Sequence, residues 1–394
     1  MSSRGAARFG RDAVGQWQRD SAGLPVYEWD LKRLPLDGTP WPHVLGTGLI
    51  QMTADQYGVL RLVGGPAEAR VEVTAPAPGC LSALRVDLQV AGRVVRLLPL
   101  AAPTAWQPQV RYGCGYVDYA LSIRDRSLPL RLDLAIGITA CPGKPYVLAE
   151  ISLRPGDGEA DGLACSLSVA ADVCWAGRRQ PAGAALFARE GAAMMSLGEG
   201  CDDAFLAGSS GWESRAVPGR LELQRPLSLR PREAVSMRLL AGTSPSCSLQ
   251  WLRQQFDGLT AEAVRAQHGE ALQKPPISAP ELWLREELLW CRAALMAYQA
   301  RDALTGRVIL QPRLGAGPVR TAQLLALCPF VQRVLPDLVR DTLVAIASRQ
   351  GPEGQLPETL DGAIPGARPD PGRERSDTEA AFLWACACWL SEAD

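Results

Sequence analysis

Short apolar segments separated by turn residues fill the chain from Trp17 to Leu240 and limit the folds that this part can adopt. Examples are YGVLRLVGG, LPLRLDLAIGITA and YVLAEISLRP, with Gly, Pro, Asp and Ser clusters between such segments. Apolar residues occupy every second position from Leu130 to Ile136, which is the period of a strand with one buried face. More than about ten such strands over roughly 230 residues exceed a small sandwich, so we expect two large antiparallel sheets packed face to face.

Helical patterns begin only after Ser246. Apolar spacing predicts one short helix near residues 249–256, and Thr260 is a suitable N-cap for a second one. The segment KPPISAP, from Lys274 to Pro280, interrupts both helix and strand and marks a domain junction. We therefore predict a β super-sandwich at residues 1–245, a helical linker at 246–276 and a helical domain at 277–394.

The helical domain is expected to consist of helical hairpins. The predicted helices are Glu281 to Arg301, Thr321 to Val331, Pro336 to Arg349 and Thr378 to Leu390, with Gly- and Pro-rich loops between them. None of these helices is polar on every face, so each helix must bury its apolar face against neighbouring helices. Trp283, Trp290, Trp384 and Trp389 lie at helical spacing, which favours core packing over stacking on a sugar.

Composition excludes several classes of protein. The formal net charge of -1 provides no field that would attract nucleic acid or an anionic membrane. No apolar run reaches the length that crosses a bilayer and the N-terminus has no signal-peptide pattern, so a cytoplasmic location is expected. The 11 cysteines stand mostly alone among apolar neighbours, as at Cys114, Cys165, Cys291 and Cys328. They are predicted to be small buried hydrophobes, without a disulfide or zinc framework.

Several segments resemble inverting disaccharide phosphorylases, and the cellobiose and chitobiose phosphorylase group in particular. DSAGLPVYEW and TPWPHVLGTGLIQM resemble a strand pair that presents a substrate-facing loop, and QVRYGCGYVDYALSI resembles a sandwich hairpin. PELWLREELLWCRAAL, GPVRTAQLLALCPF and RSDTEAAFLWACACWL resemble segments of the helical part. The resemblance implies a multidomain β plus α fold in which the helical part is an (α/α) toroid of six hairpins. Residues 277–394 are too few for six hairpins, so the toroid is expected to be incomplete.

The resemblance also implies sugar-binding residues. In these enzymes an Arg-Asp-Gln segment binds sugar hydroxyls near the scissile bond, and the corresponding residues here are Arg320, Thr321 and Gln323. Thr321 replaces a carboxylate, which removes a charged bidentate acceptor. His43, which follows Trp-Pro, corresponds to a sandwich loop that reaches the substrate, although a histidine beside a proline is also an ordinary turn residue.

Inverting cleavage of a glycosidic bond needs a carboxylic acid that protonates the leaving oxygen, and water or phosphate as the attacking group. The candidate acids are Asp377, Glu379 and Glu358. Each has a simpler interpretation: Asp377 as a helix cap, Glu379 as a first-turn acid and Glu358 as a solvated loop charge. No cofactor is expected, and inorganic phosphate is a possible co-substrate. The segment that carries the general acid in this group does not occur in the sequence, so the chain alone is expected to be inactive.

Three functions follow as alternatives. The first is a carbohydrate-active enzyme, a hydrolase or phosphorylase of β-linked glucosides or oligosaccharides. The second is a catalytically silent or truncated relative that binds sugar. The third is an interaction subunit, paired as a homodimer or completed by a separately encoded C-terminal half. Apolar residues near the end of the sequence, such as Phe382, Leu383 and Leu390, favour the second and third alternatives.

Overall fold

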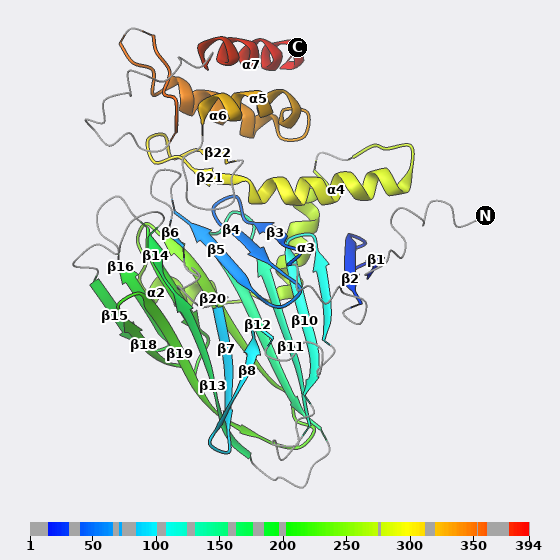
Figure 1. The fold of residues 1–394 in the computed structure, drawn as a ribbon, viewed down its shortest axis with the longest axis vertical. Helices are drawn as coiled ribbons and strands as arrows, with labels where there is room; N and C mark the ends of the chain where they lie inside the picture. Colours follow the sequence, from blue (N-terminus) through cyan, green and yellow to red (C-terminus); the bar gives the residue numbers. More distant parts are fainter. Residues whose placement is uncertain are drawn as a thin grey trace.

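Three antiparallel sheets form one end of the molecule and helices form the other (Figure 1). The computed structural model describes residues 15–30, 40–65, 71–72, 84–100, 108–123, 131–156, 163–175, 185–196, 202–274, 277–311, 320–352, 354–360 and 378–393. Within these residues the strands of the three sheets extend to Ser244, and helices follow, with one two-stranded sheet among them. The predicted β plus α multidomain architecture is therefore confirmed, whereas the domain boundaries and the toroid stay predictions.

The largest sheet has ten strands, all antiparallel to their neighbours. In spatial order they are β1 (Gly15–Arg19), β2 (Pro25–Trp29), β9 (Gln109–Gly113), β10 (Tyr116–Ile123), β11 (Leu132–Ala140), β12 (Tyr146–Pro155), β20 (Val235–Ser244), β17 (Asp203–Gly208), β16 (Ala192–Ser196) and β15 (Ala185–Arg189). Leu132, Leu134 and Ile136 are almost fully buried and Asp133 between them is half-buried, which confirms the alternation predicted from the sequence. Leu130 lies outside the described residues.

Two five-stranded sheets complete the sandwich. One contains β18 (Glu213–Val217), β19 (Arg220–Leu229), β13 (Leu163–Asp172), β7 (Leu84–Val90) and β8 (Arg93–Leu98), and the other contains β14 (Cys174–Trp175), β6 (Val71–Glu72), β5 (Leu60–Gly64), β4 (Gln51–Ala54) and β3 (His43–Gly46). A single hydrophobic cluster joins residues of all three sheets, such as Leu88, Met52 and Ile136. Burial of this shared core is the main stabilising contribution to the β region.

The linker helices α2 (Leu249–Gln255) and α3 (Ala261–Leu272) cover the face of the ten-stranded sheet opposite the main core. The Thr260 hydroxyl accepts a hydrogen bond from the Ala263 amide and caps α3, as the sequence predicts. Arg265 of α3 forms an ion pair with Asp118 and stacks over the Tyr116 ring on β10. These contacts fix the linker to the sheet.

The predicted helix from Glu281 to Arg301 is too long. The helix α4 (Leu282–Ala297) ends four residues earlier, and β21 (Gln299–Arg301) pairs with β22 (Val308–Leu310). Asp302 explains the difference, since its carboxylate accepts a hydrogen bond from the Thr305 amide at 2.7 Å and its carbonyl accepts one from the Gly306 amide. Gly306 has φ +69°, which suits this turn.

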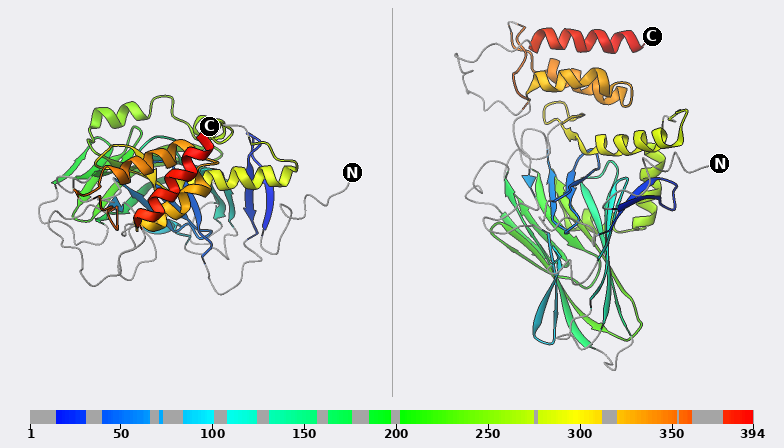
Figure 2. Two further views of the ribbon diagram at one scale, coloured as in Figure 1. Left: turned by 90° about the horizontal axis from the view of Figure 1, so that it is seen from above. Right: turned by 45° about the vertical axis from the view of Figure 1, so that its right-hand side comes forward.

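The helices α5 (Thr321–Val331), α6 (Pro336–Ala347) and α7 (Thr378–Ala393) lie beyond α4, on the side away from the sandwich (Figures 1 and 2). They share a separate hydrophobic core with β22, in which Leu324, Val339 and Ala385 are fully buried. Within the described residues no helix combines the length and apolar character that would cross a membrane.

Three of the four cysteines that were named as examples of buried residues follow this prediction, and Cys247, Cys386 and Cys388 are half-buried. Cys114, Cys165 and Cys328 are buried and unpaired. Cys291 is the exception, because its position on α4 leaves it exposed to solvent.

Candidate functional site

The N-terminus of α5 brings together most of the predicted site residues of the helical domain. Arg320 forms an isolated antiparallel bridge with Thr359, and the Thr321 amide donates a hydrogen bond to the Glu358 carbonyl at 2.8 Å. Arg320, Glu358 and Gln323, one turn further along α5, have exposed side chains. We call the surface that Arg320, Gln323 and Glu358 share the α5 polar surface.

Thr321 lies beneath this surface. Its side chain is fully buried and its hydroxyl oxygen has no hydrogen-bond partner. The residue therefore holds the segment 354–360 against α5 through its backbone, and its hydroxyl is not part of the exposed surface. A direct contact between Thr321 and a sugar stays a prediction.

Glu379 joins α7 to the same segment. Its carboxylate oxygen Oε1 accepts a hydrogen bond from the Leu356 amide at 3.2 Å. The residue lies in the first turn of α7, where the helix dipole also favours a negative charge. Asp377 and the Gly-rich loop before Arg320 lie outside the described residues. Within those residues no group of three or more His, Cys, Asp or Glu side chains is arranged to hold a metal ion.

His43 lies apart from the α5 polar surface, in β3 at the boundary between the sandwich and α4. Its Nε2–H donates to the Gly113 carbonyl at 2.9 Å, and its ring stacks against Tyr112 and Trp290, with centroids 4.7 and 5.0 Å away. Burial lowers the pKa of His43 to about 4, so the ring is neutral at pH 7.

An aromatic cavity of about 600 Å³ opens beside His43. Aromatic side chains dominate its wall, and prolines, Val44, Cys114 and two alanines of α4 complete it. Trp41 is 45% exposed, whereas Trp29 is nearly buried. The aromatic residues that line the cavity are Trp17, Tyr27, Trp29, Trp41, His43, Tyr112 and Trp290.

Strand register explains how this wall forms. Trp17 of β1 is directly opposite Tyr27 of β2, and Tyr27 is directly opposite Tyr112 of β9. Residues directly opposite one another share a face of a sheet, and so do residues two apart on one strand, which adds Trp29 to the row. Trp290 of α4 then packs edge-to-face against Trp17 at 5.0 Å.

The strand β3 and the helix α4, which both contribute residues to the cavity wall, are in close contact. A Cβ atom on Gly46 would lie 2.1 Å from the Cα atom of Ala297, so no other residue fits there without movement of the helix. The Gly48 amide also donates to the Met296 carbonyl at 3.2 Å. Gly46 therefore sets the distance between the sandwich and α4.

Five aromatic residues of the cavity were not predicted as site residues from the sequence: Trp17, Tyr27, Trp29, Trp41 and Tyr112. The alternation of Tyr27 and Trp29 in PVYEW was the available signal, since it places two large aromatic rings on one face of a strand. Trp290 was predicted to pack in a helical core. It is only partly buried and lines the cavity.

Both histidines should make the protein less stable in acid. Burial lowers the pKa of His43 and of His268 to about 4, and neither ring nitrogen of His268 has a hydrogen-bond partner. The unfolded chain takes up these protons near pH 6.5 and the folded protein near pH 4, so stability falls as the pH drops through this window. The expected loss is about 2 kcal/mol per histidine between pH 7.5 and pH 5.

Chemical denaturation at both pH values would measure this loss in the wild type and in His268→Leu. Burial raises the pKa values of Asp55 and Asp202, so the folded protein binds protons at these two groups more readily than the unfolded chain does. These carboxyl groups therefore increase the stability as the pH falls, which is opposite to the effect of the histidines. The difference between wild type and variant isolates the histidine. Equal pH dependence in the two proteins would contradict this account of His268.

Comparisons with known proteins concern the fold. No protein-family model matches the chain, and no curated protein matches it in sequence. One similar solved structure is a putative kojibiose phosphorylase from the human microbiome, with 7% identity, a TM-score of 0.51, and coverage of 78% of this chain and 47% of that one. The chain therefore has a glycoside phosphorylase-like fold. This likeness does not distinguish the cellobiose and chitobiose phosphorylase group from other glycoside phosphorylases.

Two further solved structures have lower TM-scores. A bacterial glucoamylase complexed with acarbose has 9% identity and a TM-score of 0.43, over 82% of this chain and 53% of that one. A putative aldose 1-epimerase from Escherichia coli K12 has 10% identity and a TM-score of 0.33, over 52% of this chain and 99% of that one. The chain thus spans about half the length of the phosphorylase and of the glucoamylase.

Proposed function

We propose that the chain is a carbohydrate-active protein of the glycoside hydrolase and phosphorylase type, and that the α5 polar surface binds a glucoside. The observation that carries the proposal is the fold likeness to a putative kojibiose phosphorylase. Support also comes from the bridge between Arg320 and Thr359, because it brings the predicted sugar-binding residue Arg320 next to the segment that carries the candidate acid Glu358.

Arg320 and Gln323 provide the chemistry that recognition of a sugar needs. A guanidinium group donates hydrogen bonds in a fixed fork, which suits two neighbouring hydroxyl oxygens of one sugar ring. The Gln323 amide both donates and accepts, and the exposed Glu358 carboxylate accepts from hydroxyl groups. Thr321 acts from below by fixing the segment that carries Glu358.

Cleavage, if the chain takes part in it, follows the inverting scheme. An acid protonates the glycosidic oxygen while water or inorganic phosphate attacks the anomeric carbon from the opposite face. Asp377, Glu379 and Glu358 are the candidate acids, and a β-linked glucoside is the candidate substrate. The assignments of Asp377, Glu379 and the substrate derive from the resemblance of the sequence to inverting disaccharide phosphorylases, whereas Glu358 is a candidate as a loop carboxylate that lines a pocket.

One observation favours binding without catalysis as the second candidate function. The Glu379 carboxylate already accepts a hydrogen bond from the Leu356 amide. A structural role therefore accounts for its position near the α5 polar surface. A third candidate is a subunit whose helical layer contacts another chain or a second copy. Leu383, Trp384 and Leu390 of α7 are 69%, 52% and 60% exposed, which favours such a contact.

Calorimetric titration with kojibiose and cellobiose tests the proposed function. We expect one or both to bind, and Arg320→Ala to weaken the affinity at least about tenfold, since a paired hydrogen bond to a charged group contributes about 1.5–3 kcal/mol. Arg93→Ala on β8 removes another exposed arginine and should leave the affinity unchanged. Binding that Arg320→Ala and Arg93→Ala affect equally would contradict the proposed site.

A further inference from the structure

We propose that the aromatic cavity beside α4 is a binding site for an uncharged aromatic group, distinct from the α5 polar surface. Its volume of about 600 Å³ lies in the range of small-molecule sites. The wall combines rings from five separate elements, β1, β2, β3, β9 and α4, together with Trp41 of the segment before β3. This inference does not depend on the proposed carbohydrate function.

Charge is the first property that selects the ligand. Among the residues that the structure describes, the lining contains no Asp, Glu, Lys or Arg side chain. The ionisable groups that do line it are neutral at pH 7, because burial lowers the pKa of His43 and raises those of Tyr112 and Cys114. The described lining therefore offers no cation that would pair with an anion and no carboxylate that would offset the desolvation of an organic cation.

Hydrogen-bonding capacity is the second property. The Tyr112 hydroxyl donates to the Trp41 carbonyl at 3.0 Å, and the His43 Nε2–H donates to the Gly113 carbonyl. These two polar groups are therefore committed within the protein, whereas the buried Nε1–H of Trp29 has no hydrogen-bond partner and offers one donor to a ligand. A sugar ring carries several hydroxyl groups and would leave most of them without partners, which disfavours a bare sugar in this cavity.

Ring geometry is the third property and favours an aromatic guest over an aliphatic one. The rings of the wall already contact one another edge-to-face, as at Trp17 with Trp290 (84°) and Trp29 with Trp41 (82°). The same wall also contains stacked rings at His43 with Tyr112, at an interplanar angle of 10°. A flat aromatic group gains from both arrangements, since ring faces are electronegative and ring edges electropositive.

Calorimetric titration of the full chain with indole tests this proposal. Indole should bind with a dissociation constant below about 1 mM, a value typical of good ligands of this size. Cyclohexanol, of similar bulk but not aromatic, should bind at least about fivefold more weakly, which corresponds to the added value of one aromatic contact. Tetramethylammonium and glucose should not bind at the same concentrations.

Two variants locate the site. The Trp290→Ala variant removes one wall of the cavity. The Ala294→Trp variant fills the cavity from α4 and removes no core side chain. Each variant should weaken indole binding at least about tenfold. Trp384→Ala changes an exposed tryptophan of α7 and should leave binding unchanged. Thermal unfolding of each variant shows whether it is folded, and Ala294→Trp provides the test if Trp290→Ala does not fold.

Five outcomes would overturn the proposal. Equal affinity for cyclohexanol and indole would show that the cavity has no preference for aromatic groups. Binding of tetramethylammonium that is lost in the Ala294→Trp variant would show that the cavity is a cation site. Binding of glucose that is lost in the Ala294→Trp variant would show that the cavity is a sugar site. Absence of indole binding, or binding that Ala294→Trp leaves intact, would exclude this cavity as an aromatic site.

Discussion

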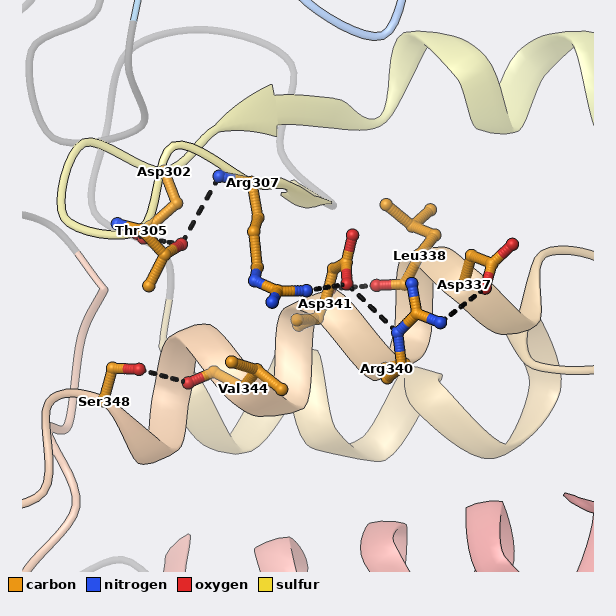
Figure 3. A network of polar contacts seen from close by, with 10 residues as sticks. Asp302, Thr305, Arg307, Asp337, Leu338, Arg340, Asp341, Val344 and Ser348 are labelled. Atoms are coloured by element: carbon orange, nitrogen blue, oxygen red, sulfur yellow. Dashed lines mark hydrogen bonds and ion pairs between the residues drawn. The ribbon is translucent and has the colours of Figure 1, made fainter.

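Asp302→Ala should destabilise the protein by about 3–5 kcal/mol, because it removes one partner of a buried ion pair. Asp302 is fully buried, its carboxylate pairs with Arg349 at the end of α6, and the same carboxylate accepts from the Thr305 amide and hydroxyl. Figure 3 shows Asp302 and Thr305 in the turn above α6. Chemical denaturation of the full chain measures the loss, which should appear as a lower midpoint with loss of the β21–β22 hairpin and its contact with α6.

Asp341→Ala is the matched control for Asp302→Ala. Asp341 also forms an ion pair between the hairpin and α6, with Arg307 at 2.5 Å, but Arg307 is 42% exposed (Figure 3). Exposed pairs contribute about 0–1 kcal/mol, so this variant should have a small effect. Equal losses in Asp302→Ala and Asp341→Ala would contradict the account, since burial would then make no difference to the pair.

Gly46→Ala should destabilise the protein by about 3 kcal/mol through overpacking. The added Cβ would lie 2.1 Å from the Ala297 Cα atom and 2.5 Å from the Ala297 amide nitrogen. Both are backbone atoms of α4, so no rotation of a side chain can relieve the clash. The helix must shift away from β3, and we expect a lower thermal unfolding temperature together with weaker indole binding in the aromatic cavity.

Gly351→Ala serves as the control for Gly46→Ala. Its added Cβ would meet only the Gln355 carbonyl oxygen, at the ordinary contact distance of 3.7 Å. Differential scanning calorimetry of both variants should separate them by several degrees, given the usual dependence of unfolding temperature on stability. A Gly46→Ala protein as stable as Gly351→Ala would show that α4 is not held against β3 in the way described.

Local patterns in the sequence predicted most elements of the fold. The alternation in β11 and the Thr260 cap of α3 depend on neighbouring residues, and both appear in the structure as predicted. The helix from Thr321 to Val331 also has its predicted bounds. The β21–β22 hairpin was missed because Met296, Ala297 and Ala300 continue the apolar pattern of the helix past Tyr298. Its turn depends on Asp302 and on the distant Arg349, which follows the end of α6.

The candidate sites were harder to predict because distant segments build them. Arg320 and Glu358 were named separately, and only the bridge to Thr359 places them together. His43 was assigned to a sugar, yet its neighbours Tyr112 and Trp290 lie far along the chain and form an apolar wall. A single sequence does not state which strands pair, so the row of Trp17, Tyr27 and Tyr112 could not be anticipated.

Hydrogen exchange with and without saturating kojibiose or cellobiose tests the central claim, that a sugar binds at the α5 polar surface. The Thr321 amide is bonded to the Glu358 carbonyl and the Leu356 amide to Glu379, so both amides report on this surface. We predict that sugar slows exchange at residues 320–324 and 354–360 by about tenfold and leaves residues 40–46 and 289–297 unchanged. Protection confined to residues 40–46 and 289–297, or no protection by either sugar, would contradict the claim.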